Sequence, residues 1–207
     1  MMNDTASLLS HLATRRSAKP RRLIAPGPSS GQLDAMLTIA ARTPDHGKLA
    51  PWRFVVIDHD RRHEFAQMLD AAYRRERPEA GRIEHEAVAA FAHQAPCLIV
   101  VLSVPDTASS IPLWEQQLSC GAATMNLLHA AHAYGFAASW ITGWAAFNRD
   151  VAVSLGARAD DRVAGFVFVG TSDDSPDERP RPALADIVRH WSGRRTDAGE
   201  DRPDVTA

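Results

Sequence analysis

Residues 116–148, QQLSCGAATMNLLHAAHAYGFAASWITGWAAFN, decide the fold because they contain no Asp, Glu, Lys or Arg. This length raises a membrane-spanning helix as one interpretation. Asn126, His129 and His132 lie in the middle, however, and Gly135 interrupts the pattern, so the apolar length is too short. The pattern therefore predicts a buried helix over about residues 115–134 of a water-soluble domain, with neighbours on most sides. Such an uncharged helix is typical of a central core or an interface with a partner chain.

The segments on either side of this helix predict a mixture of strands and helices. Ser29 and Gln32 fit a capping box that begins one helix, and Asn148 and Gly156 bound another short one. Apolar residues at helical spacing predict helices at about 33–40, 65–72 and 83–93, and β-branched or apolar runs predict strands at 53–58, 97–104, 137–143 and 163–170. Because long helices separate irregularly spaced strands, we predict an α+β fold or a mixed sheet rather than a regular parallel one.

Composition limits the class of protein. The chain has 207 residues, a formal net charge of −2 and 45% hydrophobic residues, which fits one globular domain or two small ones. The balanced charge argues against electrostatic binding of nucleic acid or an anionic membrane. Cys97 and Cys120 cannot form a disulfide scaffold, and the first residues lack the apolar core of a signal peptide. We expect a cytoplasmic protein with one domain over residues 1–191 and a polar, disordered tail over 192–207, preceded by an extended Pro-rich segment at 172–182.

Several familiar site motifs are absent from the sequence. It has no G-x-G-x-x-G, no P-loop and no G-x-S-x-G elbow. His129 and His132 could share a helix face as metal ligands, but no carboxylate or thiolate lies near them in sequence. We therefore favour packed or interface histidines and expect no metal.

Three short segments have the chemistry of a ligand site. Arg15, Arg16 and Ser17, with Lys19 close by, offer two guanidiniums, a hydroxyl and an ammonium that suit a phosphate, although a solvated helix end has the same composition. Residues 42–52 form a polar loop stiffened by two prolines, which could hold His46 against a ligand or simply connect helix to strand. Residues 139–143, SWITG, end a strand with an aromatic ring, a hydroxyl and a glycine that could face a planar ligand.

Taken in this order, the segments resemble the FMN-dependent nitroreductase family, most closely its minimal single-domain branch. The resemblance rests on RRS at 15–17, on PDH to PW at 44–52 running into RFVVID, on WEQ at 114–116, on GF-x-x-x-W-x-x-G at 135–143 and on the strand at 165–170. It spans about residues 8–188, nearly the whole folded part. It implies a central, largely antiparallel sheet flanked by helices, in an interlocked homodimer with FMN at the subunit interface.

The resemblance also implies roles for particular residues. Arg15 and Ser17 would bind the FMN phosphate with Arg16 alongside, Arg181 is a candidate second phosphate cation, and Lys19 would lie near the N1/O2 edge of the flavin. From the other subunit, His46 and the backbone of Ala50, where relatives often carry Gln, would approach the flavin. The strand end would contact the isoalloxazine ring or the ribityl chain through Trp140, Ile141, Thr142 and Gly143.

The implied activity is electron transfer in two half-reactions. NADH or NADPH would reduce the flavin, and a nitroaromatic, a quinone or another electron-poor small molecule would then take the electrons. The sequence nominates no essential catalytic residue, because no convincing acid–base pair is present. Three alternatives stay open: a flavin-binding protein with little turnover, specialised flavin chemistry on the same fold, and a hydrolase using Ser17, His46 and Asp45.

Overall fold

A computed structural model describes residues 3–172 and 176–191. The chain divides into two compact units, Met1–Pro176 and Asp177–Ala207. The described part of the second unit contains one short helix, α8 (Leu184–Ile187). The predicted tail at 192–207 lies outside the described residues, and the extension of one domain to residue 191 stays a prediction.

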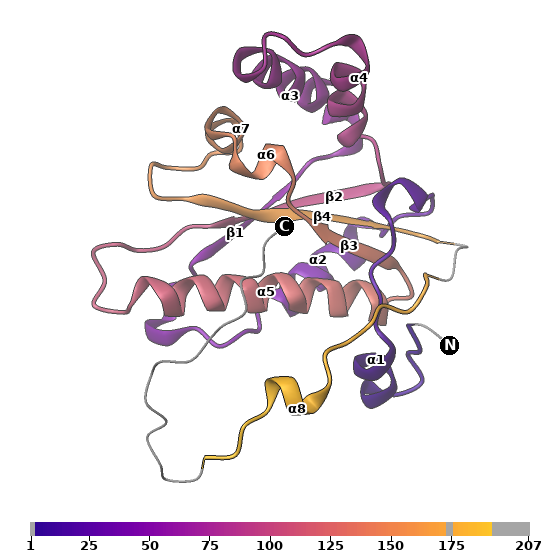
Figure 1. Ribbon diagram of the computed structural model, residues 1–207, viewed down its shortest axis with the longest axis vertical. Helices are drawn as coiled ribbons and strands as arrows, with labels where there is room; N and C mark the ends of the chain where they lie inside the picture. The colour runs from indigo at the N-terminus through magenta and orange to yellow at the C-terminus, as the bar shows by residue number, and fades with distance from the viewer. Residues whose placement is uncertain (1–2, 173–175, 192–207) are drawn as a thin grey trace. The chain divides into compact units, whose positions relative to one another are not determined.

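The first unit is built on a four-stranded sheet that confirms the predicted α+β class. The strands lie in the order β1-β2-β4-β3, and each neighbouring pair is antiparallel. They are β1 (Trp52–Val56), β2 (Cys97–Ser103), β3 (Ala137–Ile141) and β4 (Arg162–Gly170). All four predicted strands are present, although β1 and β3 each end two residues earlier than predicted. This order puts β1 and β3 at opposite edges of the sheet (Figure 1).

The sheet separates two hydrophobic cores, because alternate residues of a strand face opposite sides. In β2, Leu98 and Val100 contribute to one core while Ile99 and Val101 contribute to the other. Figure 1 shows α2 and α5 on one face and α3, α4, α6 and α7 on the other. The helices are α1 (Leu8–Thr14), α2 (Ser30–Ala40), α3 (Arg62–Glu76), α4 (Arg82–Phe91), α5 (Leu113–Ala133), α6 (Trp144–Phe147) and α7 (Arg149–Ser154), with 3-10 turns η1 (Pro20–Arg22), η2 (His46–Lys48) and η3 (His59–Arg61).

The predicted central helix is α5, and within the described residues the sheet, α2 and His11 of α1 pack against it. Pro112 precedes the first turn, so the helix begins two residues before the predicted start. Residues such as Cys120, Leu127 and Ala131 pack on the sheet, whereas Trp114 is 67% exposed and Leu118 is 54% exposed. Among the described residues, the helix therefore has neighbours on several sides and an exposed apolar face near its N-terminal end. Among the described residues, no helix is long and apolar enough to cross a membrane.

Local signals at two helix starts are confirmed. The Ser29 side chain accepts a hydrogen bond from the Gln32 N–H, and the Gln32 side chain accepts one from the Ser29 N–H. The Asn148 side chain accepts from the Val151 N–H at the start of α7. Gly156, with a φ of 87°, follows the end of α7 in the left-handed conformation that glycine adopts without strain.

Candidate functional site

The basic segment at residues 15–19 lies beside the start of β3. Helix α1 ends at Thr14, and the chain then turns so that the Ala18 N–H donates to the Ala138 carbonyl at 3.1 Å. Arg15, Arg16 and Ser17 are half-buried along this path, whereas Lys19 is exposed. A backbone hydrogen bond therefore holds this segment against β3, and guanidinium and hydroxyl groups of the kind it carries can donate to a phosphate.

Strand β3 ends in a segment whose side chains divide between core and surface. The Trp140 indole donates from Nε1 to the Ala164 carbonyl at 3.0 Å and lies over Gly165, where a Cβ would overlap the ring. The absence of a side chain at Gly165 therefore allows Trp140 to pack against β4. Ile141 is half-buried, and Thr142 and Gly143 are exposed, so the end of this predicted flavin contact is open to solvent.

The loop before β1 has an unusual backbone. Gly47, Lys48 and Ala50 have φ values of 76°, 57° and 45°, and two of these residues are not glycine. The Asp45 carboxylate accepts from the Leu49 N–H at 3.1 Å and from the Ala50 N–H at 2.8 Å, which holds the loop in this conformation. Local strain of this kind is concentrated at functional sites.

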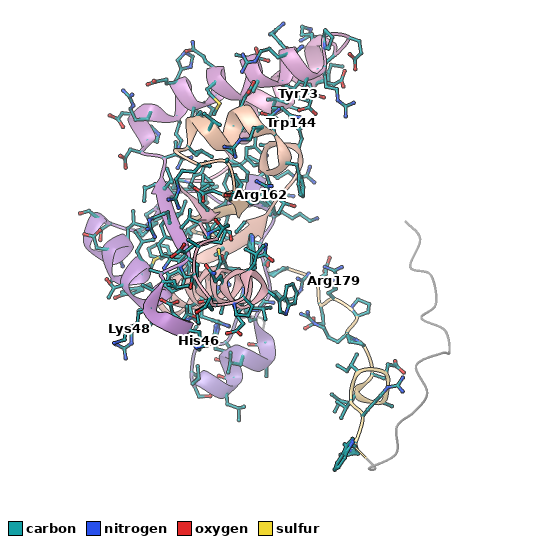
Figure 2. All side chains as sticks on the ribbon, turned by 90° about the vertical axis from the view of Figure 1, so that its left-hand side faces the viewer. His46, Lys48, Tyr73, Trp144, Arg162 and Arg179 are labelled. Carbon is teal, nitrogen blue, oxygen red and sulfur yellow. The ribbon has the colours of Figure 1, made fainter. Side chains whose placement is uncertain are left out.

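Ala50 and His46 differ in what they present to the surroundings. The Ala50 N–H donates to Asp45 and its carbonyl accepts from Arg53 Nη1 at 2.8 Å, so both backbone groups have partners within the chain. The His46 ring is exposed and its Nδ1 lies 2.8 Å from Glu115 Oε2, in the first turn of α5. Asp45 therefore holds the backbone while Glu115 orients the imidazole. Figure 2 shows His46 and Lys48 projecting from the outside of the molecule.

Three histidines join α1 to the C-terminal half of α5. His11 Nε2 lies 2.8 Å from His129 Nδ1, and the His11 and His132 ring centroids are 5.5 Å apart. Burial lowers the pKa of all three, that of His132 to about 4, and the Arg15 guanidinium lowers each further. The cluster is therefore uncharged at neutral pH. It lies close to Arg15 of the basic segment at residues 15–19, and no local sequence pattern indicates this proximity.

The three histidines pack against one another in the described part of the chain. Over residues 3–172 and 176–191, no group of three or more His, Cys, Asp and Glu side chains is placed to hold a metal ion. His11 Nδ1 and His132 Nε2 are buried without a hydrogen-bond partner in that part of the chain. These imidazoles act in packing α1 against α5.

One chain does not bring the two halves of the predicted site together. The His46 loop precedes β1, whereas Trp140 to Gly143 form the end of β3 and the two residues after it. Two strands, β2 and β4, lie between these parts, which corresponds to a distance of about 14 Å at ordinary strand spacing. The partners of the two parts are also far apart along α5. Glu115, which contacts His46, and His129, which contacts His11, are separated by roughly 21 Å at 1.5 Å per residue. Arg181 belongs to the second unit, where its guanidinium contacts Glu178 at 3.3 Å.

Comparison with known proteins identifies relatives over most of the chain. Residues 12–171 match the nitroreductase family. A Haemophilus influenzae protein named "Putative NAD(P)H nitroreductase" is 36% identical over 176 residues, which cover 84% of this chain and 92% of that protein. A nitroreductase-like family protein from Bacillus cereus has the same fold, with a TM-score of 0.76 at 20% identity over 93% of this chain and all of that one. A nitroreductase with bound FMN from Bacteroides fragilis gives a TM-score of 0.63 at 20% identity, covering 88% of this chain and 97% of that chain.

Proposed function

This chain belongs to the nitroreductase family, and we propose that it is an FMN-dependent oxidoreductase. Electrons would pass from NADH or NADPH to a nitroaromatic, a quinone or a similar electron-poor small molecule. The name of the Haemophilus influenzae relative and the FMN bound to the Bacteroides fragilis protein support this assignment. FMN, when bound, supplies the redox chemistry, and the protein supplies binding, orientation and exclusion of water.

The observation that carries the proposal is the hydrogen bond between Ala18 and Ala138. Because of this bond, Arg15, Arg16 and Ser17, the residues proposed to bind the phosphate, lie near the start of β3. Thr142 and Gly143 lie beyond the other end of the same strand. From Ala138 to Gly143 an extended chain rises roughly 16 Å. FMN is an elongated molecule with its phosphate at one end, so its phosphate and ring fit the two ends of this strand.

The separation of His46 from β3 supports a site that is completed by a second chain. Helix α5 leaves Trp114 and Leu118 exposed near its N-terminal end, with Met125 half-exposed further along the same face. Leu8 and Leu9 of α1, which lies by the C-terminal end of α5 (Figure 1), are 74% and 79% exposed. An apolar face of this kind is typical of an oligomer interface. We propose a homodimer in which α5 of each chain brings its His46 loop to the β3 end of the partner.

The hydrolase alternative finds no support in this arrangement. Ser17 lies near β3 and His46 lies near β1, at opposite sheet edges. The Asp45 carboxylate accepts from two backbone N–H groups, and the described partner of the His46 ring is Glu115. A nucleophile, a base and an orienting carboxylate within hydrogen-bonding reach of one another are required for that chemistry.

Reconstitution with FMN tests the proposed function. The protein as purified, or after addition of FMN, should be yellow, and its flavin absorbance should bleach when NADH or NADPH is added without oxygen. Arg15→Ala should weaken FMN retention roughly tenfold or more, because a charge-assisted phosphate contact is lost. Arg21→Ala, at an exposed arginine of η1, is the matched control and should retain FMN like the wild type. A protein that never takes up FMN, or equal retention by the two variants, would contradict the proposal.

A further inference from the structure

A cavity of about 310 Å³ lies between α3, α4 and α6 in the first unit. Its walls come from Leu69 and Tyr73 of α3, from Val88 and Phe91 of α4, and from Trp144 of α6. It lies on the face of the sheet opposite α5, and neither the histidine cluster nor the His46 loop contributes to it. No role described above uses these residues.

The walls of the cavity are aromatic and held in place by further rings. Tyr73 and Trp144 meet edge to face, with ring centroids 4.8 Å apart and planes at 88° (Figure 2). Phe91 meets both Phe166 and Phe168 of β4 edge to face, at 5.0 Å and 5.2 Å. Aromatic side chains packed in this way present flat apolar surfaces at a low entropic cost on binding.

The charged group in the described lining of the cavity is an acid, which disfavours a bound anion. Glu84 is the one charged residue among the described lining residues, and its Oε1 lies 3.4 Å from the Tyr73 hydroxyl. Burial, followed by the Glu84 charge, raises the pKa of Tyr73, so the phenol stays protonated and neutral. A carboxylate brought into the cavity would meet the Glu84 charge without a lining cation to offset it.

The volume fits a compact ring system. An apolar cavity of about 150 Å³ is enough for benzene, so about 310 Å³ admits one substituted ring or two fused rings. Pockets for small organic ligands begin at about this size. Gly143 is part of the lining, and it is the last residue of the segment expected to contact the flavin.

We propose that this cavity binds the neutral aromatic body of the electron acceptor, one or two rings in size, beside Gly143. The inference rests on the proposed function, because it takes Gly143 as a neighbour of the flavin. It adds a substrate class, neutral rather than anionic aromatic acceptors, and a binding surface on α3, α4 and α6.

Nitrobenzene is a suitable probe, and two alanines of α4 give a matched pair of variants. Ala87 is exposed and lines this cavity, whereas Ala90 is exposed and lines the opposite side of the α3–α4 pair. Ala87→Phe fills the cavity with a ring, so calorimetric titration of the purified protein should show nitrobenzene binding roughly tenfold or more weaker. Ala90→Phe adds the same bulk elsewhere and should bind like the wild type. Equal binding by the two variants would overturn the assignment.

The charge preference is tested with 4-nitrobenzoate. The wild type should bind nitrobenzene at least roughly tenfold more tightly than 4-nitrobenzoate. Glu84→Gln should reduce that preference, and it preserves the side-chain oxygen that accepts from the Gly81 N–H at the start of α4. A preference for 4-nitrobenzoate, or one that Glu84→Gln leaves unchanged, would overturn the charge argument.

Flavin content separates a failure of this inference from a failure of the proposed function. A yellow protein that NADH or NADPH reduces, but whose nitrobenzene binding is the same in Ala87→Phe and Ala90→Phe, overturns the cavity assignment alone. A protein that takes up no FMN overturns the acceptor role, even where nitrobenzene binding depends on Ala87. In the supporting outcome, Ala87→Phe lowers kcat/KM for nitrobenzene by the factor measured in binding while the rate of flavin reduction stays at the wild-type value.

Discussion

Acidification should destabilise this protein through His132 of α5. The side chain is 2% exposed, and burial followed by the charges of His11 and Arg15 lowers its pKa from 6.5 to about 4. In the unfolded chain the imidazole regains its ordinary pKa, so between pH 6.5 and about 4 the unfolded state binds more protons than the folded state. Stability contributed by the neutral ring is therefore complete above pH 6.5 and is lost as the pH falls through this window.

The size of the loss follows from the difference between the two pKa values. At 1.36 kcal/mol per unit, the whole shift corresponds to about 3 kcal/mol, of which about 2 kcal/mol is lost at pH 5. His11 and His129 contribute in the same direction, because burial lowers their pKa as well.

Replacement of the His132 imidazole by a side chain that cannot titrate isolates the loss of stability that its protonation causes. His132→Leu has a similar volume and cannot titrate, so its free energy of unfolding should fall by about 2 kcal/mol less than that of the wild type between pH 7.5 and 5. Urea denaturation followed by circular dichroism at fixed protein concentration measures both losses. His59→Gln, at an exposed histidine of η3, is the control and should behave like the wild type. If His132→Leu loses as much stability as the wild type, the buried imidazole does not carry the effect.

Substitutions at three further positions test the packing of buried side chains and the hydrogen bonds of the backbone. Arg62 is 3% exposed and donates to four backbone carbonyls. Arg62→Met should therefore lower the free energy of unfolding, measured by urea denaturation, by about 3 kcal/mol or more. An unchanged free energy of unfolding would contradict the stabilising role of these hydrogen bonds. Gly165→Ala would displace the Trp140 indole, so a loss of about 1–3 kcal/mol should accompany a shift in tryptophan fluorescence, and an unshifted spectrum would argue against the close approach. Asp45→Ala removes the acceptor for two loop N–H groups and should lower the free energy of unfolding by about 2 kcal/mol in the same assay. Asp45→Asn retains one acceptor and should lower it by less. Equal losses would show that these hydrogen bonds do not stabilise the loop.

Features set by neighbouring residues could be predicted from the sequence. The largely apolar run at 97–104 predicts a strand buried on both faces, and every residue of β2 is buried. The Ser29 capping box and the Asn148 cap depend on residues three positions apart, so their geometry is fixed locally. The basic segment at 15–19 and the end of β3 were proposed as site residues from their composition alone, and their role in binding stays a prediction.

Features that depend on distant residues could not be predicted. Glu115 meets His46 across 69 positions, and His11 meets His129 across 118, so no local pattern marks either pair. Arg62 reads as a surface charge at a helix start, yet the fold surrounds it with carbonyl groups from the chain before β2. The contact between Tyr73 of α3 and Trp144 of α6, which forms part of the cavity wall, likewise joins residues far apart in the sequence and could not be predicted from it.

On the proposed function, each flavin site is assembled from two chains. Arg15→Glu places a negative charge at the phosphate end, and His46→Glu places one on the loop expected to come from the partner. Each variant alone should lose FMN. When the two are mixed under conditions that exchange subunits, half of the dimers are mixed and each has one intact site, so FMN binding should return at about a quarter of all sites. Fluorescence titration of FMN with the separate and mixed proteins measures this directly. Recovery near a quarter is the predicted result, and no recovery, or full FMN binding by an isolated monomer, would contradict the account.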